Sequence, residues 1–174
     1  MKNIIKNMKC CKFAVIPVSL LILTGCMEPR VIKPTVSFDT SAASYIFDRG
    51  DNTISGQAFL RQNGGGVVTC ASSEVFIFPV NEYSNQIMSE MFGSTDKGYS
   101  IGASIVDIDA NYVKYKRVSV CDAQGNFVFK NIADGEYYLS TDVRWVIGNS
   151  RQGGYLFEKV SVNKGSNLKV LLSR

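Results

Sequence analysis

The sequence contains no histidine. This absence excludes Ser-His-Asp and Cys-His catalytic groups and zinc held by imidazole, and it removes the commonest general base of enzymes. Catalysis through carboxylates or lysine stays open as an alternative, but no constellation of such residues stands out. We therefore expect a protein that is not an enzyme and that uses no cofactor and no metal.

A basic excess is also missing from most of the chain. The formal net charge of +4 comes from 19 Lys and Arg against 15 Asp and Glu. Lys2, Lys6, Lys9 and Lys12 precede residue 26, and no acidic residue does. The remainder is formally neutral, with 15 basic and 15 acidic residues. The charge therefore gives no reason to expect nucleic-acid binding.

No apolar run is long enough to cross a bilayer as a helix. The run at 13–23 contains Pro17 and Ser19 and follows the lysine-rich residues, which is the pattern of a signal peptide. It ends in the sequence 23–26, Leu-Thr-Gly-Cys, which resembles the lipobox of bacterial lipoproteins. We predict a lipoprotein signal peptide at 1–25, with acyl chains such as palmitate carried by Cys26. The alternatives are an uncleaved membrane anchor or an ordinary cysteine of the apolar run.

The residue after Cys26 is Met27 rather than an aspartate, which favours the outer membrane over the inner one. We expect a cell-envelope protein, lipid-anchored in the outer membrane and facing the periplasm. Proline is rare, yet two of the four prolines, Pro29 and Pro34, fall between residues 26 and 43. This segment has little periodicity, so we expect the lipidated cysteine to be followed by an extended tether.

Long periodic helices are absent from residues 44–174, where glycine clusters separate short apolar segments. This pattern favours many short strands, and we predict an all-β domain, a β-sandwich of about seven strands. The segments of strand character are 53–61, 67–70, 74–79, 112–121, 127–130, 137–144, 156–162 and 168–172.

One short helix is expected within an insertion at about 80–111. Ser84 can cap its start and Gly93 can end it. Its apolar face, at helical spacing, consists of Ile87, Met88, Met91 and Phe92.

A motif in the second half of the chain bears on the fold. It combines a turn at 122–125, inward-facing Phe127 and Phe129, a second turn at 133–135, and Tyr137 two residues after a glycine. A tyrosine at this place can lock a strand crossover through a bond from its hydroxyl to the backbone.

The motif at 122–139 resembles the signature of carboxypeptidase-regulatory-like domains, which have a transthyretin-like sandwich. The resemblance covers roughly residues 52–172 and implies a Greek-key arrangement of seven strands. It implies little about function, because such modules serve as stalks, plugs, adhesins and assembly parts.

Only Cys70 and Cys121 remain as cysteines beyond Cys26. In an oxidising envelope, two cysteines near strand ends of one small domain suggest a disulfide that staples the fold. A pair of buried free thiols is the alternative.

A polar loop at 148–155 lies between Trp145 and Phe157. Its candidate partner-binding residues are Arg151, Gln152 and Tyr155. The alternative is a simple connection whose flanking aromatics belong to the core.

Two short motifs imitate functional ones. Asp107, Asp109 and Asn111 have the spacing of the first ligands of a calcium loop, but Tyr112 occupies the position of the required glycine. We expect a solvated strand edge there instead. The tripeptide Arg-Gly-Asp at 49–51 is expected only to introduce the first strand.

A basic stretch at 114–117 contains Lys114, Lys116 and Arg117. We interpret it as a charged strand edge that discourages aggregation between sheets, and not as a nucleic-acid site.

These observations favour a non-catalytic envelope lipoprotein that acts as a structural or protein-interaction module. It would be an accessory part of a secretion, pilus or surface assembly, with the membrane and other envelope proteins as partners. The alternative is a ligand-binding module for a glycan, peptide or cell-wall fragment, using the 80–111 insertion and the 148–155 loop.

Overall fold

The computed structural model describes residues 30–174, so the predicted signal peptide and Cys26 lie outside the described part. Over this range the protein is mostly β, as predicted, but it has eleven strands rather than seven. The strands are β1 (Val31–Ile32), β2 (Arg49–Arg61), β3 (Val67–Thr69), β4 (Glu74–Pro79), β5 (Lys97–Ser100), β6 (Ser104–Ile105), β7 (Arg117–Val120), β8 (Asn126–Ile132), β9 (Gly135–Ile147), β10 (Ser150–Val162) and β11 (Asn167–Leu172). The helices are α1 (Thr40–Ala43), α2 (Glu82–Phe92), α3 (Ala110–Lys114) and a 3-10 turn, η1 (Ser44–Phe47).

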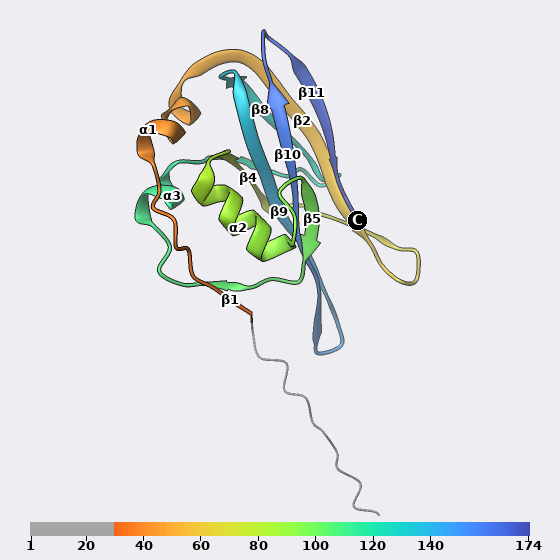
Figure 1. Ribbon diagram of the computed structural model, residues 1–174. Helices are drawn as coiled ribbons and strands as arrows, with labels where there is room; N and C mark the ends of the chain where they lie inside the picture. Colours follow the sequence, from red (N-terminus) through yellow and green to blue (C-terminus); the bar gives the residue numbers. More distant parts are fainter. Residues whose placement is uncertain (1–29) are drawn as a thin grey trace, which may run out of the picture.

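Two sheets pack face to face to form the body of the molecule (Figure 1). The first has the order β5-β10-β9-β4-β7, and all its neighbours are antiparallel. In the second, β2 pairs with β11 in parallel and with β3 and β8 antiparallel. Two short strands, β1 and β6, pair in parallel outside these sheets.

The main core lies between the two sheets. Phe127 and Phe129 of β8 are 4% and 3% exposed and belong to this core, as the alternation of the sequence predicts. On β9, Tyr137 and Leu139 point into the same core, whereas Tyr138 between them packs on the opposite face of the sheet. β9 is therefore buried on both faces, which explains its nearly continuous apolar sequence.

The turn at 122–125 has the predicted form. One carboxylate oxygen of Asp122 accepts hydrogen bonds from the backbone N–H groups of Gln124 and Asn126, at 2.9 and 2.8 Å. Hydrogen bonds from the side chain and backbone of Asn126 lower the pKa of the Asp122 carboxyl. Gly125 has a φ of +81°, and a Cβ there would lie 2.7 Å from the Ala58 carbonyl oxygen. Only glycine fits this turn without strain.

Cys70 and Cys121 form the disulfide that the sequence suggested, with a Cα–Cα distance of 5.8 Å. Cys70 directly follows β3 of one sheet, and Cys121 directly follows β7 of the other. The bond therefore links the two sheets covalently.

A third layer covers the outer face of the five-stranded sheet. It consists of α2 together with α1, α3 and the segment from residue 30 (Figure 1). Met88 of α2 packs against Tyr138 and Phe157 of the sheet, and Ile87 joins a second cluster. The other members of that cluster are Phe38, Ala43, Tyr83 and Tyr112.

The start of α2 differs from the prediction. Asn81, not Ser84, caps the helix, and Ser84 is the third helical residue. The two side chains bond reciprocally: Asn81 Oδ1 accepts from the Ser84 N–H, and the Ser84 hydroxyl oxygen accepts from the Asn81 N–H. Gly93 ends the helix in the left-handed region at φ 71°, as predicted.

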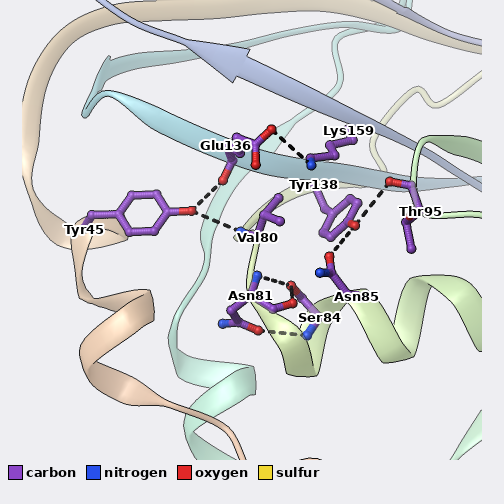
Figure 2. A network of polar contacts seen from close by, with 9 residues as sticks. All are labelled: Tyr45, Val80, Asn81, Ser84, Asn85, Thr95, Glu136, Tyr138 and Lys159. Atoms are coloured by element: carbon purple, nitrogen blue, oxygen red, sulfur yellow. Dashed lines mark hydrogen bonds and ion pairs between the residues drawn. The ribbon is translucent and has the colours of Figure 1, made fainter.

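Polar contacts hold the third layer to the sheet (Figure 2). The Tyr45 hydroxyl bonds to the Glu136 carbonyl oxygen and accepts the Val80 N–H at 3.0 Å. The Tyr138 hydroxyl lies 2.7 Å from Asn85 Oδ1 of α2, and burial raises the pKa of Tyr138 to about 12. The layer is thus positioned by directed bonds as well as by apolar contacts.

Two segments differ from the expectations. The described part of the expected tether is packed, because Ile32 and Phe38 are buried and β1 pairs with β6. The expected strand at 112–121 contains the helix α3 and only then β7. Tyr112 is buried among Phe38, Phe78 and Tyr83, and these contacts favour a helical turn there.

Candidate functional site

An open groove lies at the end of the sandwich where the β2–β3 turn, β5 and the β9–β10 hairpin meet. Its cavity volume is about 430 Å³. The lining is rich in polar and aromatic side chains and consists of Arg61, Gln62, Asn63, Gly64, Tyr99, Trp145, Ile147, Gln152, Gly153 and Arg174.

The hairpin places two of these residues side by side. Trp145 of β9 is the register partner of Gln152 of β10, so both side chains lie on the same face of the hairpin. Gly153 has a φ of +90°, and a Cβ there would collide with the Val143 carbonyl oxygen and lie 3.0 Å from the Trp145 ring. The absence of a side chain at Gly153 therefore leaves space for the Trp145 indole.

The groove combines aromatic rings with free cations. The Arg174 guanidinium lies over the Tyr99 ring, 4.6 Å from its centre. Within residues 30–174, neither Arg61 nor Arg174 forms an ion pair. Both rings, Tyr99 and Trp145, are half-buried and so keep part of their surface exposed.

Trp145 has an unusual polar atom. Its Nε1 is buried and has no hydrogen-bond partner among the described residues. A buried donor without a partner costs free energy, and such groups in folded proteins call for an explanation. Because the atom is not accessible from the groove, it does not itself indicate a ligand contact.

The groove offers flat rings, hydrogen-bond donors and two cations. Concave sites with aromatic walls and a few convergent polar groups are the usual form of small-molecule sites. The Trp145 ring can stack on the apolar face of a sugar, and Asn63 can bond to hydroxyl groups. The Gln152 amide donates to the Ser150 hydroxyl at 2.8 Å, and its carbonyl oxygen can accept from a hydroxyl group. The arrangement is therefore suited to binding a polar ligand.

The loop predicted at 148–155 is largely strand, because β10 begins at Ser150 and pairs with β9, and its candidate residues separate in the structure. Gln152 lines the groove, but Tyr155 lines a different cavity, and the exposed Arg151 lines neither. Of the two flanking aromatics, Phe157 is buried in the core, as the alternative expected, and Trp145 packs against the main core while also lining the groove. The sequence did not predict three groove residues, Tyr99, Arg61 and Arg174, because nothing in the local sequence around each of them indicates that they meet.

The second cavity is an apolar cleft between α2, α3 and the outer face of the five-stranded sheet, with a volume of about 230 Å³. Phe76, Phe78 and the two methionines of α2 make up much of its wall. Two of its lining residues, Asp142 and Tyr155, contact Arg144. Arg144 Nε lies 3.1 Å from Asp142 Oδ2, and its guanidinium lies 4.7 Å from the centre of the Tyr155 ring.

The remaining candidate motifs have structural roles. Asp109 caps α3 by accepting the Asn111 N–H, and Asp107 pairs with Lys33 at 2.8 Å. The Arg-Gly-Asp tripeptide at 49–51 begins β2. No three His, Cys, Asp or Glu side chains of the described range come together as ligands for a metal ion. No helix between residues 30 and 174 combines the length and apolar character of a membrane span.

The basic stretch at 114–117 is divided between elements. Lys116 lies 4.3 Å from the centre of the Phe76 ring, and the Arg117 guanidinium donates to the carbonyl oxygens of Lys130 and Asn131. Lys114 ends α3. The three cations therefore do not form one charged strand face.

The structure is that of a mostly-β protein of packed sheets with a groove of polar and aromatic side chains at one end. No family model matches the sequence, and no curated protein matches it either. The crystal structure of a "putative carbohydrate binding protein" from Pseudomonas aeruginosa is similar, with a TM-score of 0.64 and 22% sequence identity. The match covers 80% of this chain and 99% of that chain. At this identity, the similarity shows a common fold.

Proposed function

We propose that this protein is an envelope lipoprotein whose β-sandwich domain binds a glycan in the groove at the end of the sandwich. The observation that carries the proposal is the combination, in one groove, of two partly exposed rings, Tyr99 and Trp145, with two guanidinium groups that have no carboxylate partner within the described range. The structural similarity to a protein named as carbohydrate binding supports the same reading.

The charge of the groove suggests the kind of glycan. Arg61 and Arg174 are free of carboxylate partners within the described range. Arginine binds carboxylates and phosphates through paired hydrogen bonds that are stronger than neutral ones. A glycan that bears acidic groups fits this groove better than a neutral one.

The role as an accessory part of a secretion, pilus or surface assembly stays a prediction, as does the relationship to carboxypeptidase-regulatory-like, transthyretin-like domains. Glycan binding is preferred because a specific site supports it. Lipid on Cys26 would keep that site at the cell envelope. The proposed location is the outer membrane, with the domain facing the periplasm.

The groove is tested with a glycan array that includes acidic polysaccharides, followed by titration calorimetry of the strongest ligand. Trp145→Ala should weaken binding at least about tenfold, which corresponds to about 1.4 kcal/mol. Phe76→Ala is the matched control, because it removes a ring from the apolar cleft and leaves the groove intact. Binding that survives Trp145→Ala but is lost in Phe76→Ala would move the site to the cleft. Absence of any glycan ligand would refute the proposal.

Lipidation is tested separately in the producing bacterium. Cys26→Ser should abolish metabolic labelling with palmitate and release the protein from the membrane fraction. Unchanged labelling and membrane association in this variant would show that the lipoprotein assignment is wrong. Neither result depends on glycan binding.

A further inference from the structure

We propose that one end of the domain lies on the bilayer surface, with the tip of the β9–β10 hairpin in the lipid headgroup region. This membrane-facing end is formed by β1, residues 101–108 and the hairpin tip at 146–149. The inference rests on the proposed lipidation of Cys26. It adds a second, protein-mediated contact with the membrane.

Exposed aliphatic side chains gather at this end. Val146 and Ile147 at the hairpin tip are 67% and 60% exposed, and Ile101 is 65% exposed. Val31, Val106 and Ile108, in the neighbouring segments, are also exposed. Figure 1 shows β1, the 101–108 segment and the hairpin tip at the same end of the molecule. Apolar groups that cluster on a surface mark a contact with another apolar phase.

Contacts connect these segments. β1 pairs with β6, so Val31 lies opposite Ser104. Two residues earlier, a Cβ at Gly102 would lie 3.3 Å from the Tyr155 ring and 3.9 Å from Arg144 Nη2. Tyr155 and Arg144 stand at the base of the hairpin. These contacts join β1 and residues 101–108 to the base of the hairpin, from which the tip extends.

The hairpin is built as a projecting arm. β4 pairs with β9 only as far as Thr141, and β5 pairs with β10 only as far as Tyr155. Beyond these points the two strands pair only with each other, up to Ile147 and Ser150. A two-stranded hairpin is marginally stable alone in water, so an arm with aliphatic residues at its tip gains from a second contact.

The position of the anchor brings this end to the membrane. Ile32 is buried and pairs with Ile105, which fixes the chain close to residue 30. Only residues 27–29 separate Cys26 from Arg30. Fully extended, this connection spans at most roughly 14 Å. A lipid on Cys26 therefore holds Arg30 and β1 close to the headgroups.

This end carries charge of both signs: Arg30 and Arg151 can contact an anionic lipid surface, and Glu28, two residues before Arg30, is acidic. Arg30 and Arg151 are exposed, and neither forms an ion pair within the described range. The two other cations there are neutralised, since Lys33 pairs with Asp107 and Arg144 with Asp142. Arg151 lies opposite Val146 on the hairpin, so charge and aliphatic surface are adjacent. Basic residues next to apolar ones favour binding at a membrane interface.

The contact of the hairpin with the membrane would also fix the position of the groove. Trp145 and Gln152 occupy one face of the hairpin and line the groove, whereas Val146 and Arg151 occupy the other. A hairpin resting on the bilayer therefore holds the groove beside the membrane surface.

The test uses the full lipoprotein in vesicles of phosphatidylethanolamine and phosphatidylglycerol. Val146→Cys, on the hairpin face opposite the groove, is labelled with an environment-sensitive fluorophore, and Val128→Cys, an exposed valine of β8, is the matched control. Cys70 and Cys121 are joined and do not react with the label. We expect a blue shift at position 146 and quenching by spin-labelled headgroups, with neither effect at position 128.

Flotation of the same samples separates the two hypotheses. Protein that floats with the vesicles but shows equal quenching at both positions keeps the lipid anchor and overturns the membrane-facing end. Protein that does not float overturns the lipid anchor and, with it, this inference. A blue shift that follows protein concentration rather than the presence of vesicles would assign the surface to a second copy of the chain and overturn the inference.

Discussion

Tyr137 stands where the second turn of the 122–139 motif passes into β9. Its hydroxyl donates a hydrogen bond to the carbonyl oxygen of Ala133 at 2.9 Å. The residue is 0% exposed and belongs to the main core, and burial raises the pKa of its hydroxyl. One side chain thus ties the turn to the strand that follows it.

Tyr137→Phe should lower the free energy of unfolding by about 1 kcal/mol, because it removes this hydrogen bond and leaves the Ala133 carbonyl oxygen without its tyrosine partner. Urea unfolding of both proteins measures the change. Tyr115→Phe is the control, since the Tyr115 hydroxyl makes no hydrogen bond within residues 30–174. Equal stability losses in the two variants would contradict the role of the hydroxyl.

At the scale of single residues, the sequence predicts features that depend on residues close by in the chain. Phe127 and Phe129 follow from strand alternation, and Gly125 follows from the chemistry of a tight turn. Trp145 could not be assigned, because its position between the core and a groove depends on residues far away in the chain. Its neighbours in the groove, Tyr99 and Arg174, come from different strands and carry no local signal.

At the scale of an element, different local features determine the two ends of helix α2. Its end at Gly93 is fixed by backbone conformation, whereas its start is fixed by the reciprocal bonds between Asn81 and Ser84. A serine three residues inside the helix resembles a cap in the sequence, so the predicted start was displaced. The apolar face, which includes Ile87 and Met88, was predicted correctly because helical spacing determines it.

Gly93→Ala should destabilise the protein by about 1 kcal/mol. The added Cβ meets nothing within 4 Å, so the cost comes from the positive φ of 71° alone. Gly64→Ala is the control, because its Cβ also meets nothing within 4 Å and its φ is not in the left-handed region. Thermal unfolding of the two variants gives the comparison. A Gly93→Ala protein as stable as the control would show that the end of α2 is not constrained in this way.

Two elements could not be predicted because tertiary contacts decide them. α3 has five residues, too few for a helical period to be visible, and its aromatic sequence favours a strand. Tyr112 is helical because its ring packs between Phe78 and Tyr83. In the same way, Ile32 and Phe38 look like isolated apolar residues in a polar segment until α2 supplies their partners.

At the scale of the whole molecule, the sequence indicates the class of fold but not its strand inventory. Two strands, β1 and β6, are only two residues long, and no pattern marks them. The third layer on the five-stranded sheet comes from two separate parts of the chain, residues 30–47 and residues 82–114. Their association depends on complementary packing around Tyr83 and Phe38, which no local pattern records.

The disulfide acts at this largest scale, because it joins the two sheets across 51 positions of sequence. Closing a loop of this length restricts the unfolded chain and contributes roughly 4 kcal/mol in the chain-entropy model. Reduction should therefore move the urea unfolding midpoint to clearly lower concentration. A double variant, Cys70→Ser with Cys121→Ser, should unfold near the reduced midpoint and be insensitive to reductant. If reduction leaves the midpoint unchanged, the packing of the two sheets and not the covalent link holds the sandwich together.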